Sequence, residues 1–354
     1  MTDDSLRPDR PLVSVVVGTF NGAKFLSQQL TSLAVQTLPP AELVVSDDGS
    51  TDGTAEIVAD FGRTAPFPVR FHCNETRLGF RANFMHAAEL GQSDLIAFCD
   101  QDDVWHPDKL EIVAAAFSAP EVLLAYHKVD LIDADGHRLG ELEERSPGRA
   151  LSPPLTISPW VYGLGFTQVF RRTLLRASHH WAASVCEHDP KDPMSHDQWV
   201  AFLGSALGTI AYIDRPLASY RQHGANAFGW VPPVAQSRLA RILENRSPEF
   251  RRCAAAAAGR AGILDAIAEE SSEPWRTRAR EGARRFRRLH DLFSERDLLY
   301  AARRPAQRWG ALGRMRKLRA YDDDKPWSFG RPALLKDLGV GLLLGSVRQR
   351  GGPA

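Results

Sequence analysis

From residue 12 onward, short apolar runs rich in β-branched residues alternate with segments of helical periodicity, and this alternation limits the folds open to the chain. Residues 12–17 and 43–45 predict two strands, and Phe25, Leu26, Leu30 and Leu33 recur at helical spacing between them. Further strands are predicted at 69–71, 95–99, 122–126 and 209–213. Units of strand, helix and strand build a parallel sheet covered by helices. The pattern therefore predicts an α/β fold with a mostly parallel sheet.

Polar side chains follow the first four predicted strands. In chain order they are Thr19 and Asn21, then Asp47 and Asp48, then Asn74 and Arg77, and finally Asp100, Asp102 and Asp103. In a parallel sheet, ligands bind beyond the carboxyl ends of the strands. One such cluster alone is ordinary turn chemistry, since Asp and Asn next to Gly favour turns. Four clusters at one edge of a sheet predict a ligand site.

Three carboxylates within four residues, those of Asp100, Asp102 and Asp103, repel one another unless a cation compensates. Mg²⁺ and Mn²⁺ take oxygen ligands, commonly carboxylates together with substrate phosphates. The cluster predicts a metal-diphosphate site, with a solvated turn as the alternative. Residues 18–22 match neither the Gly-x-x-x-x-Gly-Lys loop nor the Gly-x-Gly-x-x-Gly turn, which disfavours a P-loop NTPase and a dinucleotide oxidoreductase.

The four cysteines (Cys73, Cys99, Cys186 and Cys253) form no CxxC pair and show no regular spacing, so neither a zinc site nor a disulfide framework is predicted. The first ten residues are polar and lack the apolar run of a secretory signal. Residues 338–347 are uncharged over about half the length that spans a bilayer. We therefore expect a cytoplasmic location.

The net charge of +1 is a cancellation between two regions of opposite sign. Residues 1–237 hold 18 Lys and Arg against 29 Asp and Glu, whereas residues 238–320 hold 21 against 10. Beyond residue 233 the composition turns to Ala and Arg at helical spacing. Asymmetry of this kind suggests that the two parts meet different partners.

The strand-end motifs resemble those of family 2 glycosyltransferases with the GT-A fold, and especially bacterial rhamnosyltransferase-like enzymes of surface polysaccharide synthesis. The similarity rests on residues 15–21, 44–54, 74–83 and 98–105 and covers roughly residues 11–225. It implies a Rossmann-like, mostly parallel sheet flanked by helices, with a C-terminal helical appendage. The domains expected are a disordered N-terminus (1–10), a GT-A catalytic domain (11–230, with a nucleotide-binding half at 11–105 and an acceptor-binding half at 106–230), a linker (231–237) and a basic helical region (238–354).

The resemblance also implies a role for each strand-end group. Thr19, Asn21 and Asp48 would line the nucleoside pocket, with Asp47 supporting the loop. The remaining nucleotide-sugar contacts would come from Asn74, from Arg77 at the base or diphosphate, from Asp100 at the ribose and from Asp103, which faces the sugar or acceptor or else holds the loop. Asp102 would bind the Mg²⁺ or Mn²⁺ that bridges the diphosphate.

A second group of residues follows at 195–199 and 219–226. In the resembled family an acidic residue before a helix is the general base, which makes Asp197 the candidate; capping of the helix is its alternative role. His196 would orient Asp197 or bind the acceptor, and Trp199 belongs to the same segment. His223 is a candidate second metal ligand, with a structural role equally open. Arg221 would pair with the diphosphate or a carboxylate.

The resemblance implies an inverting, metal-dependent transfer from dTDP-rhamnose or a UDP-sugar to a hydroxyl of a glycan or lipid-linked acceptor. Processive synthases carry a Gln-x-x-Arg-Trp motif and membrane helices, and the sequence has neither, so a single transfer per encounter is expected. A catalytically silent nucleotide-sugar-binding or scaffolding protein is the alternative.

The basic region has three interpretations. Arg284, Arg285, Arg287 and Arg288 alternate with Phe and Leu and fit a basic amphipathic helix that rests on anionic lipid. This would place the protein peripherally at the inner face of the membrane. A solvated helical face packed on the rest of the protein is the second interpretation. Nucleic-acid binding is the third and is disfavoured, because the region holds no nucleic-acid motif.

Overall fold

The structure is a computed structural model that describes residues 12–142, 147–160, 163–224, 246–322 and 327–344. The chain divides into two compact units. Unit 1 contains Met1–Pro154, Val161–Ser178 and Ser195–Trp230, and unit 2 contains Leu155–Trp160, His179–Met194 and Val231–Ala354. The expected disordered N-terminus and the expected linker at 231–237 lie outside the described residues, so the domain boundaries stay predictions.

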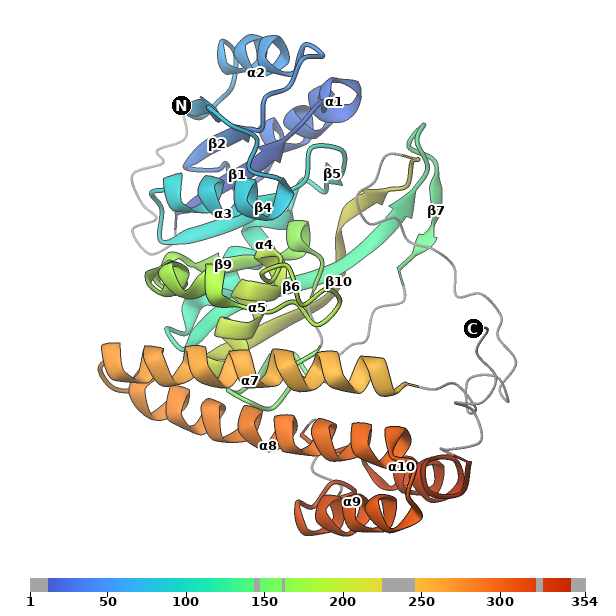
Figure 1. Cartoon of the computed structure of the whole chain (residues 1–354). Helices are drawn as coiled ribbons and strands as arrows, with labels where there is room; N and C mark the ends of the chain where they lie inside the picture. Colours follow the sequence, from blue (N-terminus) through green and yellow to red (C-terminus); the bar gives the residue numbers. More distant parts are fainter. Residues whose placement is uncertain (1–11, 143–146, 161–162, 225–245, 323–326, 345–354) are drawn as a thin grey trace. The chain divides into compact units, whose positions relative to one another are not determined.

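Unit 1 is built on one mixed sheet (Figure 1). Its strands are β1 (Val13–Thr19), β2 (Glu42–Asp47), β3 (Val69–Cys73), β4 (Leu95–Cys99), β5 (Val104–Trp105), β6 (Val122–Ile132), β7 (Arg138–Glu141), β8 (Leu151–Ser152), β9 (Val169–Arg171) and β10 (Thr209–Arg221). The order across the sheet is β3-β2-β1-β4-β9-β6-β10-β5, with β7 beside β6 and β8 beside β10. Strands β1 to β4 are parallel to one another, and β9 runs antiparallel between β4 and β6. The expected mostly parallel sheet is confirmed.

Helices cover both faces of the sheet. They are α1 (Ala23–Ala34), α2 (Thr54–Gly62), α3 (Phe80–Leu90), α4 (Lys109–Ala115) and α5 (His196–Leu207), with short 3-10 segments η2 (Ala116–Ser118), η3 (Gly165–Thr167) and η4 (Arg172–Ala183). Alternate residues of a strand point to opposite faces. Val15 and Val17 therefore share one core with α1 and α4, while Phe98 of β4 meets Phe84 of α3 on the other face.

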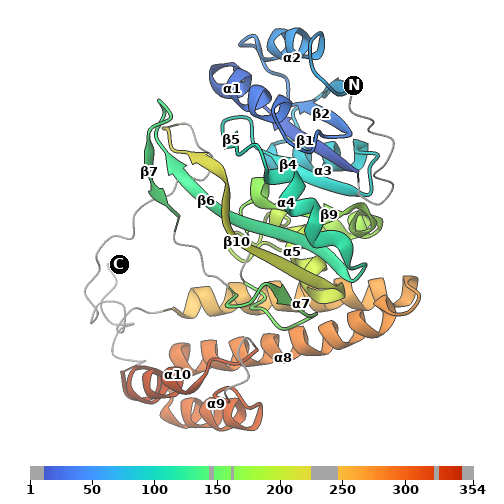
Figure 2. The same cartoon turned by 180° about the vertical axis from the view of Figure 1, so that it is seen from behind.

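The second half of the sheet differs from the sequence-based expectation. Strand β6 runs on to Ile132 and β10 to Arg221, and the two form a long parallel pair (Figure 2). The register of this pair shifts between Ile213 and Pro216 and again before Ser219. Such irregularity interrupts the alternation from which a strand is predicted, which is why only its first part was visible in the sequence.

Unit 2 is helical in its C-terminal part. The helices are α7 (Ser247–Glu270), α8 (Trp275–Ala301), α9 (Pro305–Lys317), α10 (Arg331–Lys336) and the π-helical segment η5 (Asp337–Leu344). The expected helical appendage is confirmed. Among the described residues, no helix combines the length and the apolar composition that crossing a membrane requires.

The arginines of α8 singled out in the sequence are engaged within unit 2. Arg284 and Arg285 pair with Glu281 at 2.5 and 2.9 Å, and Arg287 pairs with Asp265. The side chain of Arg288 donates to the carbonyl oxygens of Leu318 and Arg319. These contacts favour the interpretation in which this face of α8 packs on the protein.

Candidate glycosyltransferase site

The first predicted cluster forms a hydrogen-bonded turn at the ends of β1 and β2. Thr19 Oγ1 donates to Asp47 Oδ1 at 2.7 Å, and Asp47 Oδ2 accepts the backbone N–H groups of Gly49 and Ser50 at 3.2 and 2.8 Å. Both Thr19 and Asp47 are buried. Asp47 thus holds the loop after β2, and Thr19 holds Asp47.

Asp48 fastens the loop that follows β3. Its Oδ1 accepts the N–H of Leu78 at 2.6 Å and the side-chain amide of Asn74 at 3.2 Å, and its Oδ2 accepts the N–H of Gly79 at 2.8 Å. Asn74 also donates to Asn83 Oδ1 at 2.9 Å. Asp48 and Asn74 therefore shape this loop.

Asn21 and Arg77 lie at the outer side of the same cluster. Asn21 has φ of 50°, a left-handed conformation that Asn tolerates, and its Oδ1 accepts the N–H of Thr51 at 2.9 Å. The Arg77 guanidinium lies 3.8 Å from the ring centroid of Phe20, and its side chain is 65% exposed. This exposed planar stack is the part of the cluster most open to a ligand.

Gln101, which the sequence did not single out, joins this cluster to the acidic one. Its amide accepts from the backbone N–H of Phe20 at 3.0 Å and donates to the Phe20 carbonyl at 3.3 Å. A Cβ atom on Gly22 would lie 2.3 Å from Gln101 Oε1, so a residue without a side chain suits that position. The signal in the sequence was the short Gly18–Gly22 turn itself.

The three carboxylates after β4 converge as expected. One oxygen from each of Asp100, Asp102 and Asp103 lies within 4.8 Å of the others. His223 joins them, because its Nε2 lies 2.8 Å from Asp102 Oδ2. Asp103 is fully buried; its Oδ1 accepts the N–H of Arg221 at 2.9 Å, and its Oδ2 has no hydrogen-bond partner among the described residues.

Burial and the crowding of these carboxyl groups raise the pKa values of Asp100 and Asp103. Asp100 keeps partial exposure, yet burial, followed by the charges of Asp102 and Asp197, raises its pKa to about 8. Burial and the neighbouring Asp100 and Asp102 raise the pKa of Asp103 well above its usual range. The influence of Asp197 places the start of α5 within electrostatic reach of this acidic cluster.

The acidic cluster fits a divalent ion with oxygen ligands. Its carboxylates repel one another when ionised, and Asp103 Oδ2 is a buried atom with no hydrogen-bond partner among the described residues. A hard cation such as Mg²⁺ or Mn²⁺ would relieve both, with an imidazole from His223 as an acceptable further ligand.

Arg221 has a different place from the one expected. It is fully buried, with its Nε donating to the carbonyl of Asp102 at 2.8 Å and its Nη1 to the carbonyls of Asp133 and Ala134 at 3.2 and 3.0 Å. Its Nη2 donates to Gln28 Oε1 at 2.6 Å. Arg221 thus links the loop that carries Asp102 to the turn after β6 through hydrogen bonds to their carbonyl oxygens.

Lys109 is a buried cation that the sequence analysis missed. Its ammonium donates to the carbonyl of Phe166 at 2.6 Å and lies 3.3 Å from the ring centroid of Trp105. Burial lowers the pKa of Lys109 to about 7, and the charges of Cys99, Asp103 and Asp100 oppose that shift. A lysine within an amphipathic helical pattern gives no sequence signal for burial.

The start of α5 presents Asp197. Ser195 is the N-terminal cap residue, and Gln198 accepts its backbone N–H at 3.3 Å. Asp197 Oδ1 accepts the N–H of Gln198 at 2.8 Å and the hydroxyl of Ser195. The carboxylate is partly exposed, so its capping contact occupies one oxygen and leaves the other for a further partner.

His196 and Trp199 are buried. The His196 ring stacks on Phe84 with centroids 4.1 Å apart and meets Phe98 edge-on at 4.6 Å. Neither ring nitrogen has a hydrogen-bond partner among the described residues, and burial lowers the pKa of His196 to about 4. Trp199 is fully buried beside Phe202. Both side chains serve the core under α5 rather than a surface open to an acceptor.

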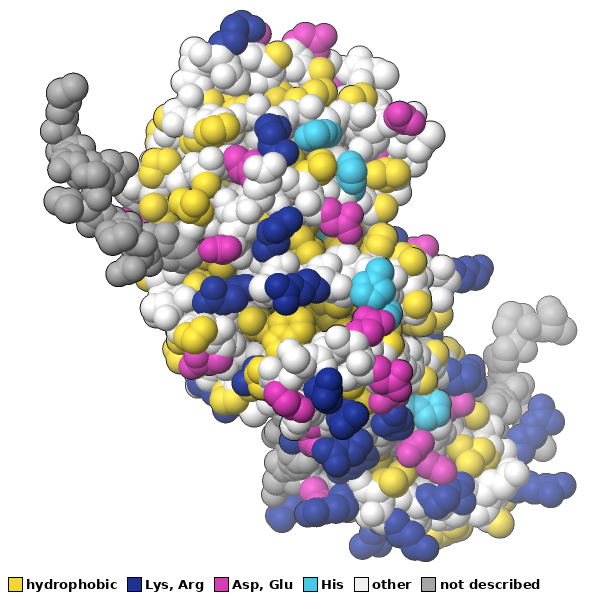
Figure 3. Space-filling view, turned by 90° about the vertical axis from the view of Figure 1, so that its left-hand side faces the viewer, with side chains coloured by type: hydrophobic (Ala, Val, Ile, Leu, Met, Phe, Trp, Pro, Cys, Tyr) yellow, Lys and Arg dark blue, Asp and Glu magenta, His cyan; other side chains and the backbone are white. Residues whose placement is uncertain are grey.

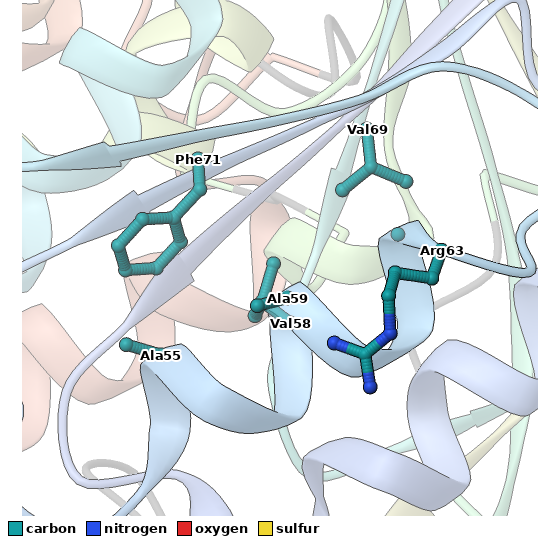
Figure 4. Close-up of a pocket in the computed structure, with 7 residues that line it drawn as sticks. Ala55, Val58, Ala59, Arg63, Val69 and Phe71 are labelled. Carbon is teal, nitrogen blue, oxygen red and sulfur yellow. The ribbon is translucent and has the colours of Figure 1, made fainter.

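A hollow of about 260 Å³ lies elsewhere in unit 1, between α2 and β3. Val69 and Phe71 of β3 lie across it from Ala55 and Val58 of α2 and from Arg63, which follows α2 (Figure 4). None of the predicted site residues lines this hollow.

Comparison with known families concerns the first half of the chain. The family model described as glycosyl transferase family 2 matches residues 14–178, which carry all the strand-end clusters of β1 to β4. Residues 14–178 carry a glycosyl transferase family 2 domain. The resemblance seen in the strand-end motifs is therefore confirmed.

Curated relatives match part of the chain. An uncharacterised glycosyltransferase of a Nostoc species is 30% identical over 227 residues, which are 60% of this chain and 66% of that protein. The putative teichuronic acid biosynthesis glycosyltransferase TuaG of Bacillus subtilis is 34% identical over 104 residues, 29% of this chain and 40% of that protein. The chain thus spans less than two thirds of the length of these curated relatives.

A solved structure supports the fold of this chain. The crystal structure of S. aureus TarS 1-349 matches with a TM-score of 0.50 and 19% identity, over 87% of this chain and 80% of that one. At this identity the likeness concerns the fold alone.

Proposed function

We propose that the protein is an inverting, metal-dependent glycosyltransferase that moves a sugar from a nucleoside-diphosphate donor to a hydroxyl of a glycan or lipid-linked acceptor. The observation that carries this proposal is the convergence of Asp100, Asp102 and Asp103 at the carboxyl end of β4, within electrostatic reach of Asp197. The inverting outcome rests on the family resemblance. TuaG is named for teichuronic acid biosynthesis, which supports a role in cell-surface polysaccharide synthesis.

In this proposal the nucleotide lies over the loops after β1, β2 and β3. Arg77, stacked on Phe20, contacts the base or diphosphate from its exposed position. Thr19, Asn21, Asp47, Asp48 and Asn74 form the floor and fix the loops around it. Asp100 contacts the ribose, and Asp103 holds the acidic loop. dTDP-rhamnose and UDP-sugars are the proposed donors.

Asp102 and His223 are the proposed ligands of Mg²⁺ or Mn²⁺. A bound ion of this class would neutralise charge that develops on the departing diphosphate. Asp197 is the proposed general base. Its carboxylate accepts the proton of the acceptor hydroxyl as that hydroxyl attacks the anomeric carbon.

The base assignment is tested by Asp197→Asn, with Asp60→Asn as a control at an exposed carboxylate on α2 that pairs with the exposed Arg63. Loss of a general base lowers turnover by about 10²–10⁴-fold. We expect that loss in product formation from a labelled donor, with donor affinity unchanged in calorimetry. Wild-type turnover in Asp197→Asn would remove the assignment.

The metal assignment is tested by Asp102→Ala in a binding screen of dTDP- and UDP-sugars with and without Mn²⁺. The wild-type protein should bind its donor more tightly with Mn²⁺, and Asp102→Ala should lose that dependence. Equal affinities of both proteins with and without the ion would contradict it. Donor binding without transfer to any acceptor tried would instead favour the silent, scaffolding alternative.

Contact with an anionic membrane is proposed for α9 rather than for α8. Residues 300–321 hold seven Lys and Arg and no Asp or Glu. Of these, Arg303, Arg304, Arg316 and Lys317 are exposed, and none has an ion-pair partner among the described residues. Trp309 is 60% exposed on the same helix. Lys and Arg side chains crowd the lower part of the face drawn in Figure 3, at the level of these helices in Figure 1.

The geometry of α9 separates an anchored side from a basic side. Ala311, Leu312 and Met315 are buried beneath the helix. At 3.6 residues per turn, Trp309, Arg316 and Lys317 fall within about 100° of one another on the other side. An indole flanked by cations suits the interface of an anionic bilayer.

Sedimentation with vesicles tests this contact. Each basic residue near an anionic surface contributes about 1 kcal/mol, so the double change Arg316→Ala and Lys317→Ala should weaken binding by about 30-fold. Arg172→Ala with Arg176→Ala is the control, because it removes two exposed cations outside unit 2. Equal binding of both double variants, or equal binding to neutral vesicles, would contradict the proposal. Stronger binding to a salt-matched oligonucleotide would favour nucleic acid.

A further inference from the structure

Two histidines and a glutamate of unit 2 meet at one point. His179 Nε2 lies 3.0 Å and His180 Nε2 lies 3.1 Å from the same atom, Glu270 Oε2. The two imidazole rings have their centroids 4.0 Å apart. All three ligand atoms lie within 4.8 Å of one another.

The position of Glu270 makes this arrangement costly without a cation. Glu270 is the last residue of α7 and follows Glu269, and the last turn of the helix holds no basic residue. The carboxyl end of a helix carries partial negative charge, so carboxylates there are unfavourable and cations are favourable. The two imidazoles offer ring nitrogens to Glu270 and no permanent positive charge.

The spacing of the three atoms is close to that of a chelate. Zinc binds imidazole nitrogen and carboxylate oxygen at about 2.0–2.2 Å, and two ligands at a tetrahedral angle are then about 3.4 Å apart. The observed separations of 3.0 and 3.1 Å need to widen by only a few tenths of an ångström. His179 and Glu270 are more than half exposed, so an ion and a completing water have access.

In two other groups of possible metal ligands among the described residues, a carboxylate already accepts hydrogen bonds from the protein. Asp133 Oδ1 accepts the N–H groups of Asp135 and His137 in a turn. Glu187, which neighbours Cys186, is held by the buried Arg260 at 2.9 Å. Within the described part of the chain, His179 and His180 hydrogen-bond to Glu270, and no residue outside this group holds them.

We propose that His179, His180 and Glu270 bind one zinc ion, with water completing the coordination. Two imidazoles and a carboxylate are a donor set that zinc favours, whereas Mg²⁺ and Mn²⁺ prefer all-oxygen sites. The ion joins the segment His179–Met194 to the end of α7. Arg260 pins the same segment to α7 through Glu187, so the ion adds a second tie between the same two parts of unit 2.

The test uses the full-length protein, freed of metal by a chelator and then titrated with Zn²⁺ in excess Mg²⁺. Calorimetry, the zinc-dependent rise in unfolding temperature and the visible absorption of Co²⁺ in its place report binding without a transferase assay. His180→Ala and the conservative Glu270→Gln should each weaken Zn²⁺ binding by at least about tenfold. His72→Ala, at a partly exposed histidine outside these clusters, should leave it unchanged.

Two outcomes would overturn the proposal. The first is equal Zn²⁺ affinity in the wild type and Glu270→Gln, whose exposed position keeps the variant folded. The second is a Zn²⁺ response that survives His180→Ala and disappears in His188→Ala or Asp102→Ala, which would place the ion elsewhere. Failure of this proposal leaves the proposed transferase function untouched, since the two are measured separately.

Discussion

Acidification should destabilise unit 1 through one buried imidazole, that of His196. The ring lies between Phe84 and Phe98, and burial lowers its pKa from 6.5 to about 4. The unfolded chain takes up this proton below about pH 6.5, whereas the folded chain takes it up only near pH 4. Between these values the unfolded state binds more protons, so stability decreases as the pH falls.

The size of the effect follows from the two pKa values. A difference of about 2.5 pH units corresponds to about 3 kcal/mol. Linkage then predicts a loss of about 2 kcal/mol at pH 5 relative to pH 7, and about 3 kcal/mol at pH 4. Because the ring is nearly inaccessible, solvent screening removes little of this.

The comparison is between the wild type and His196→Phe, which keeps an aromatic ring beside Phe84 and cannot titrate. Pulsed hydrogen exchange across a urea series, followed on peptides from β1 and β4, measures the unfolding free energy of unit 1 at each pH. The wild type should lose about 2 kcal/mol more than the variant between pH 7 and pH 5. A constant packing cost of the larger ring cancels in this difference, and so does the buried His127, which titrates in both proteins. Equal pH dependence would refute the reasoning.

Three further outcomes are expected. Gly165→Ala should lower the unfolding free energy of unit 1 by about 1–3 kcal/mol in urea, because its Cβ would lie 2.5 Å from His196 Nε2. An unchanged unfolding free energy would mean that the His196 ring moves aside without cost. Arg221→Met should cost about 3 kcal/mol by the same measurement, since three carbonyl oxygens lose their donor, and a neutral result would contradict the linking role. Glu281→Gln should change the stability of unit 2 by no more than about 1 kcal/mol in thermal unfolding, because its exposed pairs with Arg284 and Arg285 are weak; a larger loss would show that α8 depends on them.

The first half of the fold could be predicted because its signals are local. Each of β1 to β4 is an apolar run that ends in a polar turn, and the carboxyl ends of parallel strands meet at one edge. The convergence of Asp100, Asp102 and Asp103 followed from that geometry, whereas His223, which lies beside Asp102, was a candidate ligand through the family resemblance. Their chemical roles stay predictions.

Other features of the fold and the site could not be predicted, because they depend on contacts between residues far apart in the sequence. Strand β9 has three residues and takes its place from β4 and β6, so no periodicity marks it. Arg221 and Lys109 are residue types that are normally exposed, and their burial depends on carbonyl oxygens that come together only in the folded chain. The same holds for Asp48, whose oxygens are used by the loop after β3.

The division of the chain into units has a consequence for any attempt to shorten it. The chain passes from one unit to the other five times, after Pro154, Trp160, Ser178, Met194 and Trp230. A protein truncated at residue 230 would keep Leu155–Trp160 and lose the partners of that segment: Trp327 and Arg285, which donate to the carbonyl of Leu155, and Arg260, which donates to that of Pro159. We therefore expect that unit 1 cannot be produced alone by ending the chain at residue 230, because residues 155–160 would lose the side chains that hold them.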